Sequence, residues 1–211
     1  MRCALMALVA FLRRWFWKCA SCNNPTDSTF CQLCALSLVR APAEPPESVH
    51  LSAYVYGGAM ARAIQRAKYH HRPDLWAGLS CAMNSLYAEL ERRSFDVVVP
   101  IPSHPSRLAE RGHNPAALLA TSVASPLSLA LDTSSLIRLH PTPSQARLGR
   151  SERLLGPVGS FGVRGRVLRG ASVLLVDDVR TTGATLNAAC LALQGAGVRA
   201  YRTVTLAMSE T

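Results

Sequence analysis

Two adjacent carboxylates followed by a threonine- and glycine-rich turn are the residues of this sequence best suited to chemistry. The apolar run Val173–Val176 reads as a buried strand, Asp177 and Asp178 stand at its end, and Thr181–Thr185 lead into an apolar-periodic segment that reads as a helix. A loop between a strand and a helix N-terminus directs several backbone N–H groups at one point, which suits a phosphate. The threonine hydroxyls add donors, and Gly183 allows the backbone to approach closely.

The two carboxylates would repel a phosphate unless another group lay between them. Sugar hydroxyls, alone or with a divalent cation, meet that need, so a ribose 5-phosphate fits the run Val173–Thr185. The alternative is an ordinary strand–turn–helix with polar residues at the strand end, since every short motif carries a risk of chance matches.

Four of the seven cysteines form a second chemical cluster. Cys19, Cys22, Cys31 and Cys34 make two CxxC pairs inside sixteen residues. Each pair can place two thiolates on one side of a tight turn, and two such turns close a tetrahedral zinc site. Disulfides and a redox CxxC are the competing interpretations, but the odd cysteine total and the close spacing of the pairs favour zinc in a structural role.

Composition sets the limits for the rest of the chain. The 211 residues are 49% hydrophobic and 17% charged, which indicates a core-forming protein and excludes a disordered one. The net charge of +10 comes almost entirely from arginine, because Lys18 and Lys68 are the only lysines. This balance suits nucleotides, diphosphates or nucleic acid, although arginine usage can also reflect genomic base composition.

The N-terminal segment invites a membrane interpretation that its length does not support. Its apolar run, Cys3 to Leu12, is too short to span a bilayer, and most of the positive charge follows the run instead of preceding it. We expect an amphipathic helix that docks on the protein or on a partner, with contact to a membrane surface as the lesser alternative. The expected location is cytoplasmic.

The periodicity divides the chain into three parts and predicts an α/β fold. Residues 1–40 would hold the N-terminal helix and the cysteine knuckle, 41–49 a proline-rich linker, and 50–211 the main domain. Within that domain the pattern predicts helices at 59–69, 75–93, 114–123 and 184–195, and strands near 54–56, 96–102, 136–139, 161–163, 172–177 and 200–206. Strands that alternate with helices imply a parallel sheet, whose ligands bind at the carboxyl ends of the strands.

Further motifs recur in order along the chain and carry a family resemblance. They are the double CxxC, Lys68-Tyr69, Val99–Pro102, Arg107, Arg111–Asn114, Thr142, Gln145, Leu148, Arg153 and the thirteen residues of Val173–Thr185. In this order they resemble the ComF-type family of competence-associated phosphoribosyltransferase-like proteins, over about residues 19–208. Two positions depart from that pattern: His113 stands where an aromatic residue is usual, and Pro115 where a glutamine commonly follows the asparagine.

The resemblance implies a type I phosphoribosyltransferase-like fold, a parallel sheet flanked by helices, with a small zinc-binding element at the N-terminus. It also implies that Asp177 and Asp178 bind the ribose hydroxyls of phosphoribosyl diphosphate, directly or through Mg2+. Arg111 joins them as a catalytic candidate because a cation there would neutralise the departing diphosphate. The remaining substrate-binding candidates are Lys68, Tyr69, Arg107, Gln145, Arg153, Val179, Arg180, Thr181, Thr182, Gly183, Ala184 and Thr185.

The arginine-rich stretch 140–159 leaves two function classes open. In an active transferase it would be a lid that closes over the diphosphate and excludes water. In a DNA-handling protein of the competence machinery the same charges would bind single-stranded DNA, and the sugar-phosphate pocket would be retained without catalysis. The acceptor and the oligomeric state are not specified by the sequence.

Overall fold

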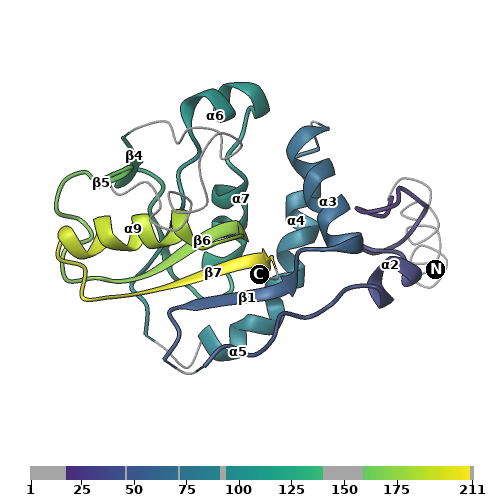
Figure 1. Cartoon of the computed structure of the whole chain (residues 1–211), viewed down its shortest axis with the longest axis horizontal. Helices are drawn as coiled ribbons and strands as arrows, with labels where there is room; N and C mark the ends of the chain where they lie inside the picture. Colours follow the sequence, from purple (N-terminus) through teal and green to yellow (C-terminus); the bar gives the residue numbers. More distant parts are fainter. Residues whose placement is uncertain (1–17, 46, 71, 91–93, 140–158, 210–211) are drawn as a thin grey trace, which may run out of the picture.

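A five-stranded, all-parallel sheet forms the centre of the computed structural model, which describes residues 18–45, 47–70, 72–90, 94–139 and 159–209 (Figure 1). The strand order is β1-β7-β6-β2-β3. The strands are β1 (His50–Val55), β2 (Val97–Pro100), β3 (Ala130–Leu131), β6 (Ser172–Arg180) and β7 (Ala200–Met208). The two nine-residue strands, β6 and β7, lie inside the sheet, and β6 is valine- and leucine-rich because both of its faces are covered.

Helices cover both faces of the sheet. One face packs against α3 (Gly58–Tyr69), α4 (Asp74–Cys81), the 3-10 turn η1 (Ala82–Leu86), α5 (Tyr87–Leu90) and α7 (Pro115–Ala124). The other face packs against α9 (Ala184–Gly195) and an antiparallel pair, β4 (Leu136–Arg138) and β5 (Phe161–Val163). Strand β6 serves both cores: Leu174 and Val176 point into the first, Val173 and Leu175 into the second.

The cysteine-containing turn packs directly on α3 and α4. Cys19, Ala20 and Phe30 are buried in the same hydrophobic cluster as these helices. The Arg66 Nη1 atom donates to the carbonyls of Cys19 and Ala20, each at 2.9 Å. A short helix, α2 (Gln32–Leu36), ends the turn and contains the fourth cysteine.

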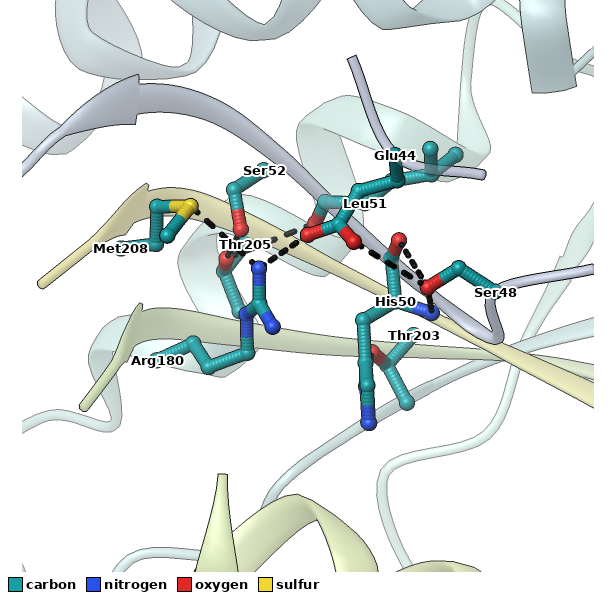
Figure 2. A network of polar contacts seen from close by, with 9 residues as sticks. All are labelled: Glu44, Ser48, His50, Leu51, Ser52, Arg180, Thr203, Thr205 and Met208. Carbon is teal, nitrogen blue, oxygen red and sulfur yellow. Dashed lines mark hydrogen bonds and ion pairs between the residues drawn. The ribbon is translucent and has the colours of Figure 1, made fainter. Parts of the chain in front are cut away.

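The segment after the cysteines runs along the outer edge of β1. Arg40 pairs with Tyr54 in an antiparallel bridge, and the Ala41 N–H donates to the Ala53 carbonyl at 3.1 Å. Further on, the Glu44 carboxylate forms an ion pair with Arg180 at the end of β6 and accepts a hydrogen bond from the Ser48 hydroxyl at 3.3 Å (Figure 2). The linker is therefore fastened to the sheet through both backbone and side chains.

A row of small polar side chains lies beneath this linker (Figure 2). The Ser52 and Thr205 hydroxyls are 2.8 Å apart, and the His50 Nδ1 atom lies 2.8 Å from the Thr203 hydroxyl. Ser52, Thr203 and Thr205 are all buried, and each has a hydrogen-bond partner, as buried polar groups require.

Most predicted elements are confirmed, and the differences have local causes. The predicted helix over 75–93 is divided into α4, η1 and α5; Asn84 and Ser85, which lie in η1, are residues that compete with helical hydrogen bonding. The predicted loop after Pro102 contains α6 (Pro105–Arg111), which begins with Pro105 at its first position and His104 as an accepting N-cap. Strand β6 continues to Arg180, so the acidic pair lies within the strand and not after its end.

The N-terminal helix predicted before Lys18 and the end of the helix predicted at 91–93 lie outside the described residues. Among the residues that the structure does describe, no helix has the length and apolar character needed to cross a membrane.

Candidate active site and cysteine cluster

A polar cavity of about 210 Å³ lies at the carboxyl ends of β2 and β6. It brings together the end of α3, the loop after β2, the helix α6, the start of α7, one residue of β4 and two residues of β6. Its lining consists of Lys68, Tyr69, Ile101, Pro102, Ser103, His104, Arg107, Arg111, Asn114, Pro115, Arg138, Asp177 and Asp178. Six predicted site residues, from segments up to 110 positions apart, therefore meet at one cavity.

Asp178 is paired with Lys68 at the cavity wall. The Lys68 Nζ atom lies 2.7 Å from the Asp178 Oδ1 atom, and the side chains are only 18% and 13% exposed. The two side chains thus form a partly buried ion pair at the edge of the cavity. Any hydroxyl or cation that binds Asp178 must share this carboxylate with Lys68 or displace the amine.

Asp177 stands in a different electrostatic environment from its neighbour. Burial and the charge of Asp178 raise the pKa of Asp177 to about 7, against the opposing effects of the Asp178 backbone N–H, Lys68 and Arg138. The Asp178 N–H donates to the Asp177 Oδ1 atom at 2.8 Å, which fixes the orientation of the carboxyl group. The negative charge of the two carboxylates is therefore only partly compensated. A bound cation or hydrogen bonds from hydroxyl groups would stabilise it further.

Arginines supply most of the remaining charge of the cavity. The Arg111 guanidinium lies 4.7 Å from the centre of the Tyr69 ring, and its Nη2 atom donates to the Tyr69 hydroxyl at 2.9 Å. Arg107 lies 3.3 Å from Glu110 with both side chains more than half exposed, so this ion pair restrains Arg107 little.

Arg138 is a cavity residue that the sequence reasoning did not select. It extends from β4 over the ring of Phe161, 5.0 Å from its centre, and its Nε atom is buried without a hydrogen-bond partner among the described residues. Burial lowers the pKa of Arg138, and Asp177 opposes that effect. Its position at the last residue of a weak strand, just before an arginine-rich stretch, is the sequence signal that could have found it.

The threonine- and glycine-rich turn follows β6 directly after the acidic pair. Gly183 has a φ of +77°, which favours glycine, and it begins α9 without any side chain capping the helix. The Ala184 N–H donates to the Thr182 hydroxyl at 3.4 Å, and Thr181 and Thr182 are exposed. Apart from this long contact, no side chain caps the start of the twelve-residue helix, which leaves the following N–H groups of its first turn for an anion, although Thr181–Thr185 do not line the 210 Å³ cavity.

The other predicted substrate-binding residues lie elsewhere or outside the described residues. Val179 packs against the larger hydrophobic core. The Arg180 guanidinium contacts Glu44 and lies 3.3 Å from the Met208 sulfur (Figure 2). Gln145 and Arg153, together with the predicted lid, belong to the stretch that the structure does not describe.

The four knuckle cysteines converge on one point. Their Sγ atoms all lie within 4.8 Å of one another, and those of Cys22 and Cys31 are 3.6 Å apart. A tetrahedral ion with Zn–S bonds of about 2.3 Å needs sulfur–sulfur distances of about 3.8 Å. No disulfide joins the described cysteines, so the four thiols form a possible metal site.

The cysteines differ in how readily they ionise. Burial opposes ionisation of Cys19, but backbone N–H groups of Cys22, Cys31 and Ser21 outweigh it and lower the Cys19 pKa to about 6. Burial raises the pKa of Cys34 to about 11. Because the thiolate is the metal-binding form, the backbone around Cys19 favours that form, whereas burial disfavours it at Cys34.

Comparisons with known proteins agree with this arrangement. A family model for the phosphoribosyl transferase domain matches residues 68–210. The chain is 29% identical over 180 residues to competence protein ComFC of Bacillus subtilis (strain 168), covering 84% of this chain and 72% of that protein. It is 28% identical over 188 residues to competence protein ComFC of Streptococcus pneumoniae (strain ATCC BAA-255 / R6), covering 89% and 79%. The predicted resemblance to the ComF-type family is thereby confirmed.

Among solved structures, an allosteric regulatory enzyme of purine biosynthesis aligns at 17% identity with a TM-score of 0.46. The alignment covers 67% of this chain and 29% of that structure, so the present chain spans less than a third of the other's length.

Proposed function

Because the chain belongs to the phosphoribosyl transferase domain family, we propose that it binds phosphoribosyl diphosphate and transfers the phosphoribosyl group to an acceptor. The observation that carries the proposal is the convergence of an acidic pair and several cationic side chains at the 210 Å³ cavity, with an uncapped helix start following the same strand outside the cavity lining. No single one of these features would be sufficient, since each also occurs in structural roles.

The three parts of the substrate fit three parts of the site. The N–H groups and hydroxyls of Thr181–Thr185 would bind the 5-phosphate at the start of α9. Asp177 and Asp178 would bind the ribose hydroxyls. Lys68, Arg107, Arg111 and Arg138 would contact the diphosphate, with Gln145 and Arg153 added from the predicted lid.

Transfer of the phosphoribosyl group depends on neutralising the charge of the departing diphosphate more than on a strong nucleophile. Loss of diphosphate from the sugar leaves a cation-like carbon and a departing polyanion, and fixed cations stabilise that anion as it forms. Mg2+, when bound, would neutralise diphosphate charge further, and the carboxylates of Asp177 and Asp178 would hold it. Exclusion of water by the lid would protect the reactive sugar from hydrolysis.

The cysteine cluster has a separate, structural role in this proposal. Zn2+ held by Cys19, Cys22, Cys31 and Cys34 would stabilise a polar turn whose own apolar residues are few. The turn packs on α3, so the zinc would also support the helix that ends in Lys68 and Tyr69.

A second candidate function follows from the relatives. Both curated relatives are named competence proteins, and this chain has a net charge of +10. A protein that retains the sugar-phosphate pocket but works by binding single-stranded DNA or competence-machinery proteins would share these features.

Calorimetry with phosphoribosyl diphosphate, with and without Mg2+, tests the first function. We expect binding that Mg2+ strengthens and that Gly183→Val abolishes, because the new side chain would fill the space for the phosphate. Gly170→Val is the matched control: Gly170 has a similar φ of +75°, and a Cβ there meets no atom within 4 Å. If the parent bound DNA but not phosphoribosyl diphosphate, the second function would replace the first.

A further inference from the structure

His113 links the protein core to the cavity through both of its ring nitrogens. The indole N–H of Trp76 donates to the His113 Nε2 atom at 3.2 Å, and the His113 Nδ1 atom lies 2.9 Å from the Arg111 carbonyl oxygen. Since Nε2 accepts and Nδ1 must donate, the ring is neutral with its proton on Nδ1. A phenyl ring at this position could make neither contact.

The position of His113 in the chain makes this link important. It lies in the corner between α6 and α7, after Gly112, whose φ of +74° ends α6, and before Asn114, which caps α7. Trp76 is 1% exposed and belongs to the main core. The histidine therefore ties a surface corner to one of the most firmly packed side chains of the molecule.

The helix that carries Arg111 has little else to hold it in place. No residue of α6 is buried, so this seven-residue helix lacks the apolar face that normally fixes a helix on its domain. Arg111 is its last residue, and its Nη2 atom reaches the Tyr69 hydroxyl at 2.9 Å. Its Nε atom is buried and has no hydrogen-bond partner among the described residues, so this end of the side chain has no hydrogen bond of its own to hold it.

We propose that His113 is a positioning residue that holds Arg111 against the cavity for an anionic ligand, the diphosphate of the proposed function. The inference deepens that function and rests on it for the identity of the ligand. His113 does not line the cavity and acts only through the Arg111 backbone. Where the family pattern usually has an aromatic residue, His113 therefore forms a hydrogen-bonded bridge between Trp76 and the Arg111 carbonyl.

The test uses His113→Phe, which keeps an aromatic ring and removes both hydrogen bonds. Binding of inorganic diphosphate and of ribose 5-phosphate is measured by calorimetry in the full chain, alone and combined with Arg111→Met. We expect diphosphate affinity to fall about three- to tenfold, as for one ordinary hydrogen bond or slightly more, with ribose 5-phosphate affinity changed less than twofold. In the Arg111→Met background, His113→Phe should cause no further loss.

Two additional variants keep the test decisive if His113→Phe folds poorly. Trp76→Phe removes the indole donor together with part of a buried ring, leaves His113 in place, and should weaken diphosphate binding in the same selective way. His113→Gln, whose amide both donates and accepts, should restore part of the affinity. Equal loss of both ligands, or an undiminished effect of the substitution in the Arg111→Met background, would overturn the positioning role.

A readout without ligand separates this proposal from the proposed function. The Arg111 Nε–H resonance, assigned in a nitrogen-15 spectrum through its loss in Arg111→Met, should exchange with solvent faster in His113→Phe than in the parent. If the resonance responds while neither probe binds the parent, the proposed function fails and the positioning role stands. If it does not respond, the positioning role is refuted.

Discussion

Asp177→Asn should make the protein more stable at alkaline pH while it weakens ligand binding. Burial and Asp178 raise the pKa of Asp177 from 3.8 to about 7, so the native state retains a proton that the unfolded chain releases. Between about pH 4 and pH 7 the native state therefore binds more protons, and stability falls as the pH rises. Asparagine has no charge to lose, so the variant escapes this fall.

The size of the effect follows from the raised pKa. At 1.36 kcal/mol for each tenfold change in acidity, the rise to about 7 corresponds to about 4 kcal/mol above pH 8. Asp177 is only partly buried and its surroundings can relax, so we expect about 1–3 kcal/mol. Urea unfolding at pH 4.5 and 8.5 should show a small stability difference at the lower pH and a clearly more stable variant at the higher, since most of the effect develops above pH 4.5.

Binding should move in the opposite direction. If Asp177 binds the ribose hydroxyls as proposed, loss of this charged acceptor should lower ribose 5-phosphate affinity about ten- to a hundredfold at pH 8.5. Asp178→Asn is the control, because it removes the partner of Lys68 and should destabilise the protein instead of stabilising it. A stability difference between Asp177→Asn and the parent that did not change with pH would refute the electrostatic reasoning.

Three other outcomes are expected. Freshly purified, reduced protein should contain about one zinc per chain by elemental analysis, and Cys19→Ser should lose it; zinc-free parent protein would remove the knuckle from the proposal. Arg147→Ala and Arg153→Ala should weaken diphosphate binding if residues 140–159 form a lid. If these arginines bind DNA instead, each substitution should reduce the salt dependence of DNA binding by about one phosphate contact, which would favour the DNA-handling function. Glu44→Gln should lower the free energy of unfolding by about 1–3 kcal/mol, because it leaves the partly buried Arg180 charge without its ion-pair partner. Glu47 is exposed, so Glu47→Gln should change the free energy of unfolding by less than about 0.5 kcal/mol. Equal effects of the two substitutions would contradict the importance of this ion pair.

Short sequence patterns predict those helices and strands that depend on interactions between residues close together in the chain. Asn114 and Pro115 mark the start of α7 correctly, because an accepting cap and a proline at the first position act within one helical turn. The valine- and leucine-rich run 173–176 identifies β6 because a strand covered on both faces needs apolar residues at every position. The sequence predicts a strand only from Tyr54, whereas β1 begins at His50. His50 and Ser52 are polar, and they become strand residues through their partners on β7.

The candidate site was predictable where a motif is contiguous and much less so where distant segments meet. Asp177, Asp178 and Gly183 lie within seven consecutive residues, and their type and order indicate a sugar phosphate. The cavity position of Arg138 and the Trp76–His113 contact depend on tertiary packing, which no periodicity encodes. The ion pair of Arg180 with Glu44 is a further tertiary contact that its place in the motif does not predict, and a role for Arg180 in substrate binding stays a prediction.

The antiparallel course of residues 39–41 beside β1 also bears on how accessible the edge of the sheet is to another strand. An open sheet exposes a row of N–H and C=O groups at each outer strand, where a second molecule can add its own strand. Here β3 offers only two residues at one margin, and at the other the Val55 N–H donates to the Val39 carbonyl while the Ala41 N–H donates to Ala53. The segment that joins the cysteine-containing turn to the domain thus also covers part of the β1 edge with backbone hydrogen bonds. A shortened version of the chain that began at residue 50 would leave the β1 margin open to edge-to-edge aggregation, so a productive truncation has to start before Val39.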